Sequence, residues 1–188
     1  MRADPIRAAA AAGLVALCGG LATGQIVGGD ATTIAPPAAV GDDNFDTDEL
    51  FAFAERQNVT LSSDLTVDGG VIAAGTVVSS FYVVYDPGAT GTFVGTVEFA
   101  DQIIGVITDT AGQNDSDFLG APGTNYLNPS LRGLEDPPDI VSFSGSVLSV
   151  NLQASTPGDA IRVITVPAPV PASAVAFLCL SGLRRRRG

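Results

Sequence analysis

Two groups of closely spaced oxygen-bearing side chains are the residues of this 188-residue chain that could do chemistry. The first group alternates along an acidic stretch and comprises Asp42, Asn44, Asp46 and Asp48. Carboxylate and amide oxygens at alternate positions ligate calcium in EF-hand loops. The EF-hand pattern then fails, because Thr47 stands where the loop needs glycine and Phe53 where it needs glutamate. The stretch therefore predicts either a solvated acidic cap on the helical turn that follows or a calcium site.

The second group, Asn114, Asp115 and Asp117, lies in a glycine- and proline-rich segment over 109–138. A segment of that length without a strand or helix pattern is typical of a functional loop or a loosely ordered one. Its polar side chains could hold calcium or a sugar. They could equally form an asparagine- and aspartate-rich turn, so both interpretations stay open.

Missing residue types exclude much of enzyme chemistry. The body of the chain, 25–166, contains no histidine, lysine or cysteine, because Cys18 and Cys179 lie near the two ends. Ser-His-Asp and Cys-His catalysis, thiolate zinc sites and lysine Schiff bases are therefore excluded there. Paired carboxylates can hydrolyse glycosidic bonds without histidine, but no pattern brings two of them into a dry cleft. We expect the protein not to be an enzyme.

The charge of the body is strongly negative. Nineteen carboxylic acids face only Arg56, Arg132 and Arg162, which leaves a net charge of −16. Such a body repels nucleic acid and anionic membrane surfaces. Apart from the possible calcium, we expect no cofactor.

The elements that would position these groups read as strands. Alternating or β-branched runs, separated by turn residues such as Asp86-Pro87-Gly88, cover 59–67, 76–85, 92–100, 102–108, 140–143, 148–152 and 161–166. They predict an all-β fold over 46–166, an antiparallel, jelly-roll-like β-sandwich. Asp48 and Glu49 suit the amino end of a short helix over 50–56. The segment 25–45, with Pro36-Pro37 and no regular period, predicts a flexible acidic leader.

The amino end, 1–24, has the layout of a secretory signal peptide. Arg2 and Arg7 precede an apolar run over 8–17, and the small residues Ala22 and Gly24 follow. We expect export by Sec-type machinery and cleavage after Gly24. A lipoprotein signal at Cys18 is the weaker alternative, because the residue before such a cysteine is small and here it is Leu17.

The carboxyl end, 167–188, has three parts in a fixed order. Pro167, Pro169 and Pro171 predict an extended stalk. The apolar run 172–183 predicts a helix of roughly 20 Å, too short for the ~30 Å hydrocarbon core, so it would be a marginal span. Four arginines follow, Arg184, Arg185, Arg186 and Arg187. Basic residues beside an apolar segment stay on the cytoplasmic side, so the tail predicts transient anchoring in an inner membrane.

This layout resembles the PEP-CTERM sorting signal of bacterial surface proteins, which an exosortase is thought to recognise and cleave. Val166, Pro167, Ala168 and Pro169 match the family's Val-Pro-Glu-Pro except for the glutamate. The body is also similar to a recurrent ectodomain of such proteins in the runs SSFYVVYDP, GVITDT, FLGAPGTNY, RGLE and PGDAIRVIT. The resemblance implies an exosortase-type partner and a secreted or cell-surface location.

Together these features predict an exported, non-enzymatic surface or matrix protein. The alternative is a secreted module that binds calcium or carbohydrate.

Overall fold

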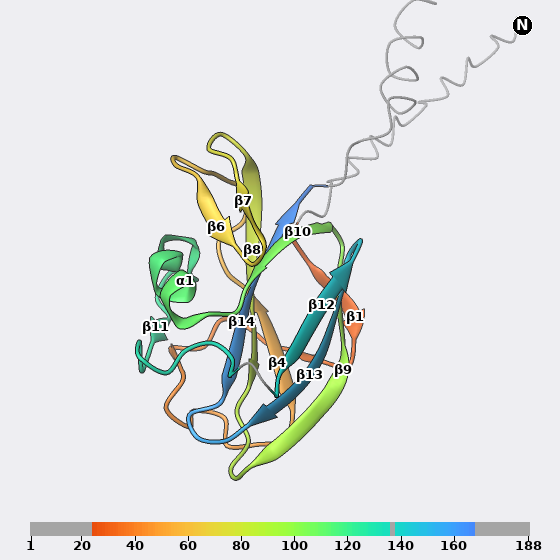
Figure 1. Ribbon diagram of the computed structural model, residues 1–188, viewed down its shortest axis with the longest axis vertical. Helices are drawn as coiled ribbons and strands as arrows, with labels where there is room; N and C mark the ends of the chain where they lie inside the picture. The colour runs from red at the N-terminus through yellow and green to blue at the C-terminus, as the bar shows by residue number, and fades with distance from the viewer. Residues whose placement is uncertain (1–23, 136–137, 168–188) are drawn as a thin grey trace, which may run out of the picture.

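The computed structural model describes residues 24–135 and 138–167, and this part of the chain is mostly β (Figure 1). Its strands are β1 Ile26–Gly29, β2 Thr32–Thr33, β3 Ala39–Val40, β4 Leu50–Ala54, β5 Val59–Thr60, β6 Leu65–Val67, β7 Gly70–Ile72, β8 Val77–Tyr85, β9 Gly91–Phe99, β10 Gln102–Ile107, β11 Asn125–Tyr126, β12 Ile140–Ser144, β13 Val147–Ala154 and β14 Asp159–Val166. Within the described residues, helical structure is limited to α1 Thr110–Asp115 and the 3-10 turn η1 Asp117–Leu119. The expectation of an all-β fold is confirmed.

Two larger sheets organise the body. One has the strand order β1-β9-β13-β12 and is antiparallel throughout. The other has the order β10-β14-β8-β4-β2, with β5 also paired to β8. The short β2–β4 and β3–β11 pairings are parallel, and the other pairings between the described strands are antiparallel.

A hydrophobic cluster joins the two larger sheets. Alternate residues of β13 point into it, as the alternation of exposed and buried positions along that strand shows. Phe81 and Val83 from β8 meet Val97 from β9 and Leu148 from β13 in this cluster. Tilted packing of Phe81 against Phe99, with ring centroids 4.8 Å apart, crosses the space between the sheets.

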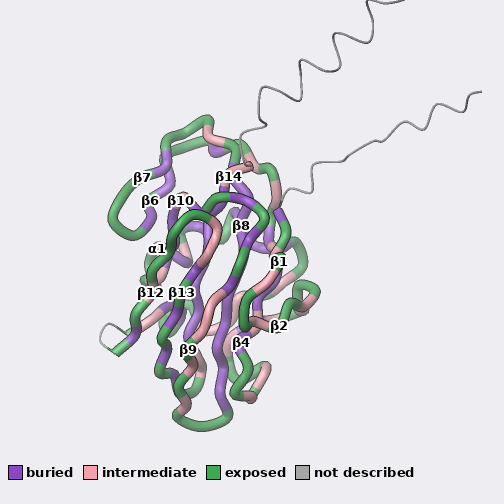
Figure 2. The backbone as a smooth tube through the Cα atoms, turned by 90° about the vertical axis from the view of Figure 1, so that its right-hand side faces the viewer, coloured by how far each residue is buried: buried purple, intermediate pink, exposed green. Residues whose placement is uncertain are grey.

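The opposite face of β8 and β14 is covered by a second layer. Val78 packs with the β6–β7 hairpin, and Tyr82 and Val84 pack with residues around β3 and β11. Because both faces are covered, β8 is buried from Val78 to Tyr85, and Figure 2 shows this strand as a continuous buried stretch. The segment 109–138, expected as a long loop, supplies much of this layer through α1, η1 and β11.

Two local expectations were wrong. The segment 25–45 is not a flexible leader, because β1 pairs with β9, β2 with β4 and β3 with β11. The run 50–56 is not a helix, because Leu50–Ala54 forms a strand between β8 and β2. A short apolar run carries no reliable period, so pairing with β8 overrode the local preference for a helix turn.

Replacing Phe81 with alanine should lower the free energy of unfolding by about 3–5 kcal/mol, because this fully buried ring fills the space between the sheets. Val94→Ala on β9 is the control, since Val94 is 75% exposed and should cost less than about 1 kcal/mol. Urea denaturation of both variants measures the difference. Equal losses would contradict the placement of Phe81 in the core.

Candidate functional site

The first predicted calcium group lies in the loop between β3 and β4. Asp86, which is fully buried, organises this loop: its carboxylate accepts a hydrogen bond from the Phe45 amide at 3.0 Å, and its carbonyl accepts one from the Thr47 amide at 2.9 Å. Asp42 accepts a hydrogen bond from the side chain of Asn128 at 3.1 Å. None of the carboxylates of Asp42, Asp46 and Asp48 belongs to a group of three that could share one metal ion among the described residues. The structure thus places this group in a loop ordered by hydrogen bonds, and calcium binding there stays a prediction.

The second predicted group, Asn114, Asp115 and Asp117, lies on α1 and at the start of η1. Asn114 accepts a hydrogen bond from Arg132 at 3.0 Å and donates one to the Pro129 carbonyl at 2.6 Å. Asp117 receives two hydrogen bonds from Arg132, at 2.7 and 2.8 Å. Asp115 is exposed at the end of α1. Arginines therefore satisfy two of these three side chains, which favours a structural role for them.

Arg162 of β14 is the centre of a buried polar network, which we call the Arg162 network. Its side chain is fully buried and forms a bidentate ion pair with Glu55, with both N–O distances 2.8 Å. Its remaining N–H groups donate to the Gln113 carbonyl at 2.8 Å, to the Ser116 hydroxyl at 2.6 Å and to Asp117 at 3.1 Å. All five N–H donors of the guanidinium are thus used.

Glu55, immediately after β4, is equally well satisfied. Besides Arg162 it accepts hydrogen bonds from the Ser80 hydroxyl at 2.5 Å and from the Tyr126 hydroxyl. Burial and the negative charge of Glu55 raise the pKa of Tyr126 far above its usual range. The phenol therefore stays protonated and donates a hydrogen bond to Glu55. Burial alone would lower the pKa of Arg162, but Glu55 outweighs it and the pKa is raised, so the guanidinium remains charged.

The Arg162 network is balanced in charge. Arg132 and Arg162 face Glu55 and Asp117, and both guanidinium groups lie over the ring of Tyr126, at 4.9 and 5.4 Å from its centroid. The Arg162 guanidinium and the Glu55 carboxylate are buried and hydrogen-bonded throughout, whereas the Asp117 side chain is 40% exposed and Arg132 Nε has no hydrogen-bond partner. This network joins α1, η1 and β11 to the sheet and serves the fold.

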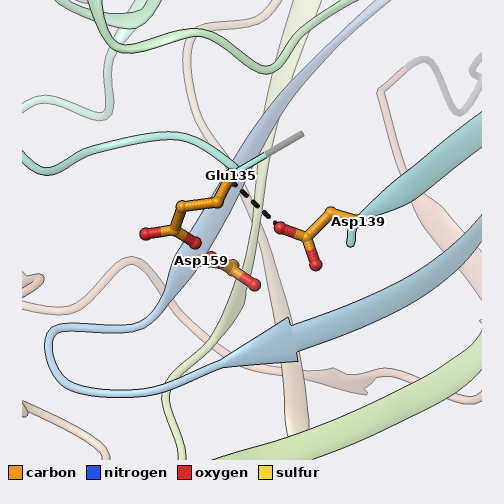
Figure 3. A group of neighbouring side chains, drawn as sticks. All are labelled: Glu135, Asp139 and Asp159. Carbon is orange, nitrogen blue, oxygen red and sulfur yellow. Dashed lines mark hydrogen bonds between the residues drawn. The ribbon is translucent and has the colours of Figure 1, made fainter. Parts of the chain in front are cut away.

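A second group of acids, the carboxyl cluster, consists of Glu135, Asp139 and Asp159. Carboxylate oxygens of all three lie within 4.8 Å of one another, and Figure 3 shows the three groups turned toward a common point. Asp139 is nearly buried, and its two oxygens accept hydrogen bonds from the backbone amides of Gln153 at 2.7 Å and Glu135 at 3.1 Å. These bonds fix Asp139 between β13 and the segment that precedes β12.

Asp159, the first residue of β14, is the most enclosed member of the carboxyl cluster. It is only 2% exposed, and its Oδ2 atom is buried without a hydrogen-bond partner. Burial and, after it, repulsion by Asp139 and Glu135 raise the pKa of Asp159 to about 8. A cavity of about 20 Å³, enough for about one water molecule, adjoins Asp159. Glu135 is exposed, and Asp139 lines a second, open pocket of about 380 Å³, so only the Asp159 side of the cluster is closed to solvent.

Sequence reasoning missed both groups, because each forms only when segments far apart in the chain come together. A signal existed for one of them. Arg162 interrupts an otherwise apolar strand, and a charge at such a position requires a buried partner. The carboxyl cluster gave no comparable signal, since Glu135 lies in a segment that reads as a loop.

Most of the predicted sorting motif lies outside the described residues. Val166 ends β14 and Pro167 follows it, whereas Pro169, the apolar run 172–183 and the arginines at 184–187 are not described. The signal peptide expected over 1–24 lies outside them too, apart from Gly24. Within the part of the chain that is described, no helix is long and apolar enough to span a membrane.

Comparisons with known proteins found no match for this chain among protein-family models, curated proteins or solved structures.

Replacing Arg162 with methionine should lower the free energy of unfolding by about 3–5 kcal/mol, because Glu55 would remain buried without its main partner. The double variant Glu55→Met/Arg162→Met should lose clearly less than the sum of the two single variants. Chemical denaturation of the three proteins gives the coupling. Arg56→Met, on an exposed neighbour, should change stability by less than about 0.5 kcal/mol. Additive single losses would show that the pair is not coupled.

In metal-free buffer the protein should lose stability as the pH rises from about 4 to about 8. The raised pKa of Asp159 means that the folded state binds this proton more tightly than the unfolded state. The proton therefore adds its full stabilisation at a pH below the pKa of Asp159 in the unfolded chain, and this stabilisation is lost as the pH approaches the pKa of Asp159 in the folded protein. Asp159→Asn should flatten the slope, by at most about 1.4 kcal/mol per pH unit. The difference between variant and wild type isolates Asp159 from Asp86, whose pKa burial also raises. Identical slopes in thermal melts would contradict this account.

Proposed function

We propose that this chain is an exported, non-enzymatic surface or matrix protein of a bacterium, sorted through a PEP-CTERM-like signal at its carboxyl end. Sec-type machinery would export it, the apolar run 172–183 would hold it briefly in the inner membrane, and an exosortase-type enzyme would process the tail. The acidic body would then remain on the cell surface or be released, without binding nucleic acid.

The observation that carries this proposal is that the body begins and ends at one pole. The Gly24 amide donates to the Asp101 carboxylate at 3.0 Å, and the Gln25 carbonyl accepts from the Ala100 amide at 2.8 Å. Val166, the last residue of β14, pairs with Gln102. Residues 24–25 and 166 therefore flank the same short turn between β9 and β10, at the top of Figure 1.

Two chain ends at one pole suit a domain whose amino-terminal and carboxyl-terminal signals are both recognised at the membrane. A signal peptide and a tail attached to one pole would leave the other pole facing away from the membrane. The carboxyl cluster lies toward that distal pole, because Asp159 and Val166 are the two ends of the same strand.

For the fold, we propose a jelly-roll-like β-sandwich. The connections β8–β9, β9–β10 and β13–β14 each pass from one larger sheet to the other, as connections in a jelly roll do. These crossing connections place the hydrophobic cluster between the two larger sheets.

Replacing Arg184, Arg185, Arg186 and Arg187 with alanine should prevent processing of the tail, because no basic block would then stop the apolar run during export. Mass spectrometry of the carboxyl terminus, with cell fractionation, measures the outcome in a bacterium that encodes an exosortase. The wild type should lack its terminal arginines, and the variant should keep its full tail or leave the surface fraction.

Two variants serve as controls for this test. Lysine at the same four positions keeps the positive charge and should retain the membrane pause, and Ala168→Glu restores the family's motif and should be processed at least as completely. Normal surface delivery of the alanine variant, together with an unprocessed wild-type tail, would refute the sorting proposal.

A further inference from the structure

The carboxyl cluster lies where three segments of the body meet. Glu135 and Asp139 belong to the segment between β11 and β12, and Asp159 begins β14 in the other larger sheet. Asp139 is also bound to the amide of Gln153 on β13. The three carboxyl groups therefore stand between the two larger sheets, with oxygens within 4.8 Å of one another (Figure 3).

No side-chain cation of the body is available to this cluster. The body has three basic residues in total. Arg132 and Arg162 are committed to Asp117 and Glu55, and Arg56 is exposed beside η1 and the start of β11, where it lines a pocket with Asp117. The charged groups that act on Asp159 are Asp139 and Glu135, and both are acidic.

The enclosed carboxylate of Asp159 is the second observation. Its Oδ2 atom is buried and has no hydrogen-bond partner, in a residue that is 2% exposed. Leaving a buried carboxylate oxygen unsatisfied is costly, and most such atoms in proteins are paired or bind an ion. The oxygens of Asp139 each accept one backbone amide, which leaves a lone pair on each for a further contact.

We propose that Glu135, Asp139 and Asp159 bind one divalent cation of the size of calcium. Calcium takes six to eight oxygen ligands at about 2.3–2.6 Å, so two of its ligands can lie up to about 5 Å apart. The spacing of the cluster fits that limit. Three carboxylates can supply three to six oxygens, since each binds such an ion through one oxygen or both.

A cation at this position fastens the segment before β12 to β14. The direct backbone bond between these segments is long, from the Ala160 amide to the Gly133 carbonyl at 3.4 Å. A shared ion adds a direct link between this segment and β14. The site differs from both calcium groups expected from the sequence, since its residues lie outside 42–48 and 114–117.

In the absence of the ion, a proton takes its place. Burial and the neighbouring acids raise the pKa of Asp159, so without the ion this carboxyl group holds a proton more tightly than an exposed aspartic acid does. Cation and proton therefore compete for the cluster, and the test must separate them.

The test uses the full chain, purified in a non-ionic detergent and stripped of metal with a chelator that is then removed. Calcium is added to about 10 mM, roughly a hundred times the Kd of about 10⁻⁴ M found in extracellular modules. Binding of that strength should raise the thermal midpoint by about 5–10 °C and give measurable heat in calorimetry. Magnesium at the same concentration should give a clearly smaller shift.

Asp159→Asn is the decisive variant, because the amide keeps the shape and removes the buried charge. Without metal, this variant should unfold at or above the thermal midpoint of the wild type. Its affinity for calcium should be at least tenfold lower than that of the wild type. Asp115→Asn is the matched control: it removes the same charge from an exposed position on α1 and should keep the full response.

Four results would overturn the proposal. The first is a flat calorimetric trace with no shift in the thermal midpoint of the wild type at about 10 mM calcium, which would leave the proton as the only occupant. The second is a wild-type response in Asp159→Asn, and the third is loss of response in Asp115→Asn, which would move the site to α1. The fourth is an equal shift with magnesium, which would contradict the assignment to an ion of calcium's size.

Discussion

The bidentate ion pair between Arg162 and Glu55 is the interaction on which the second layer of the protein depends. Burying two charges is costly unless every donor and acceptor is satisfied, and here all five N–H groups of Arg162 have partners. Those partners come from the end of β4 and from α1 and η1, so a segment without a strong pattern of its own is held against the sheet. Tyr126 adds its hydroxyl to the same carboxylate from β11. The segment that contains α1, η1 and β11 is ordered because its polar groups are the hydrogen-bond partners of the buried Arg162 guanidinium and of Glu55.

Charge balance distinguishes the Arg162 network from the carboxyl cluster. The body holds nineteen carboxylic acids and three arginines, and the Arg162 network uses two of the arginines. Exposed Glu135 meets the buried Asp139 and Asp159 with no arginine left to balance the three acids. A proton can neutralise one of them, and a divalent cation can neutralise the group while connecting its members. Export into a calcium-containing environment would make the second solution available, which links the inference about the cluster to the proposed location without depending on it.

Sequence patterns predicted the long strands well and the contacts between distant segments poorly. The β-branched runs of β8 and β14 and the alternation of β13 indicate strands by themselves. By contrast, β1 is short and contains two glycines, and pairing with β9 some 70 residues later defines it. The run Leu50–Ala54 has no clear period and became a strand through β8. The carboxyl cluster could not be predicted, because only the packing of the two larger sheets brings Glu135 and Asp159 together.

The central claim is that two groups of acids are balanced by cations, by arginine in the Arg162 network and by a bound metal ion in the carboxyl cluster. Anomalous diffraction from a crystal grown with calcium tests it most directly. The account predicts one peak between Glu135, Asp139 and Asp159, with oxygen ligands at about 2.3–2.6 Å. It would be contradicted by an empty cluster in which Asp159 shares a proton with Glu135, or by a peak confined to the loop that follows β3.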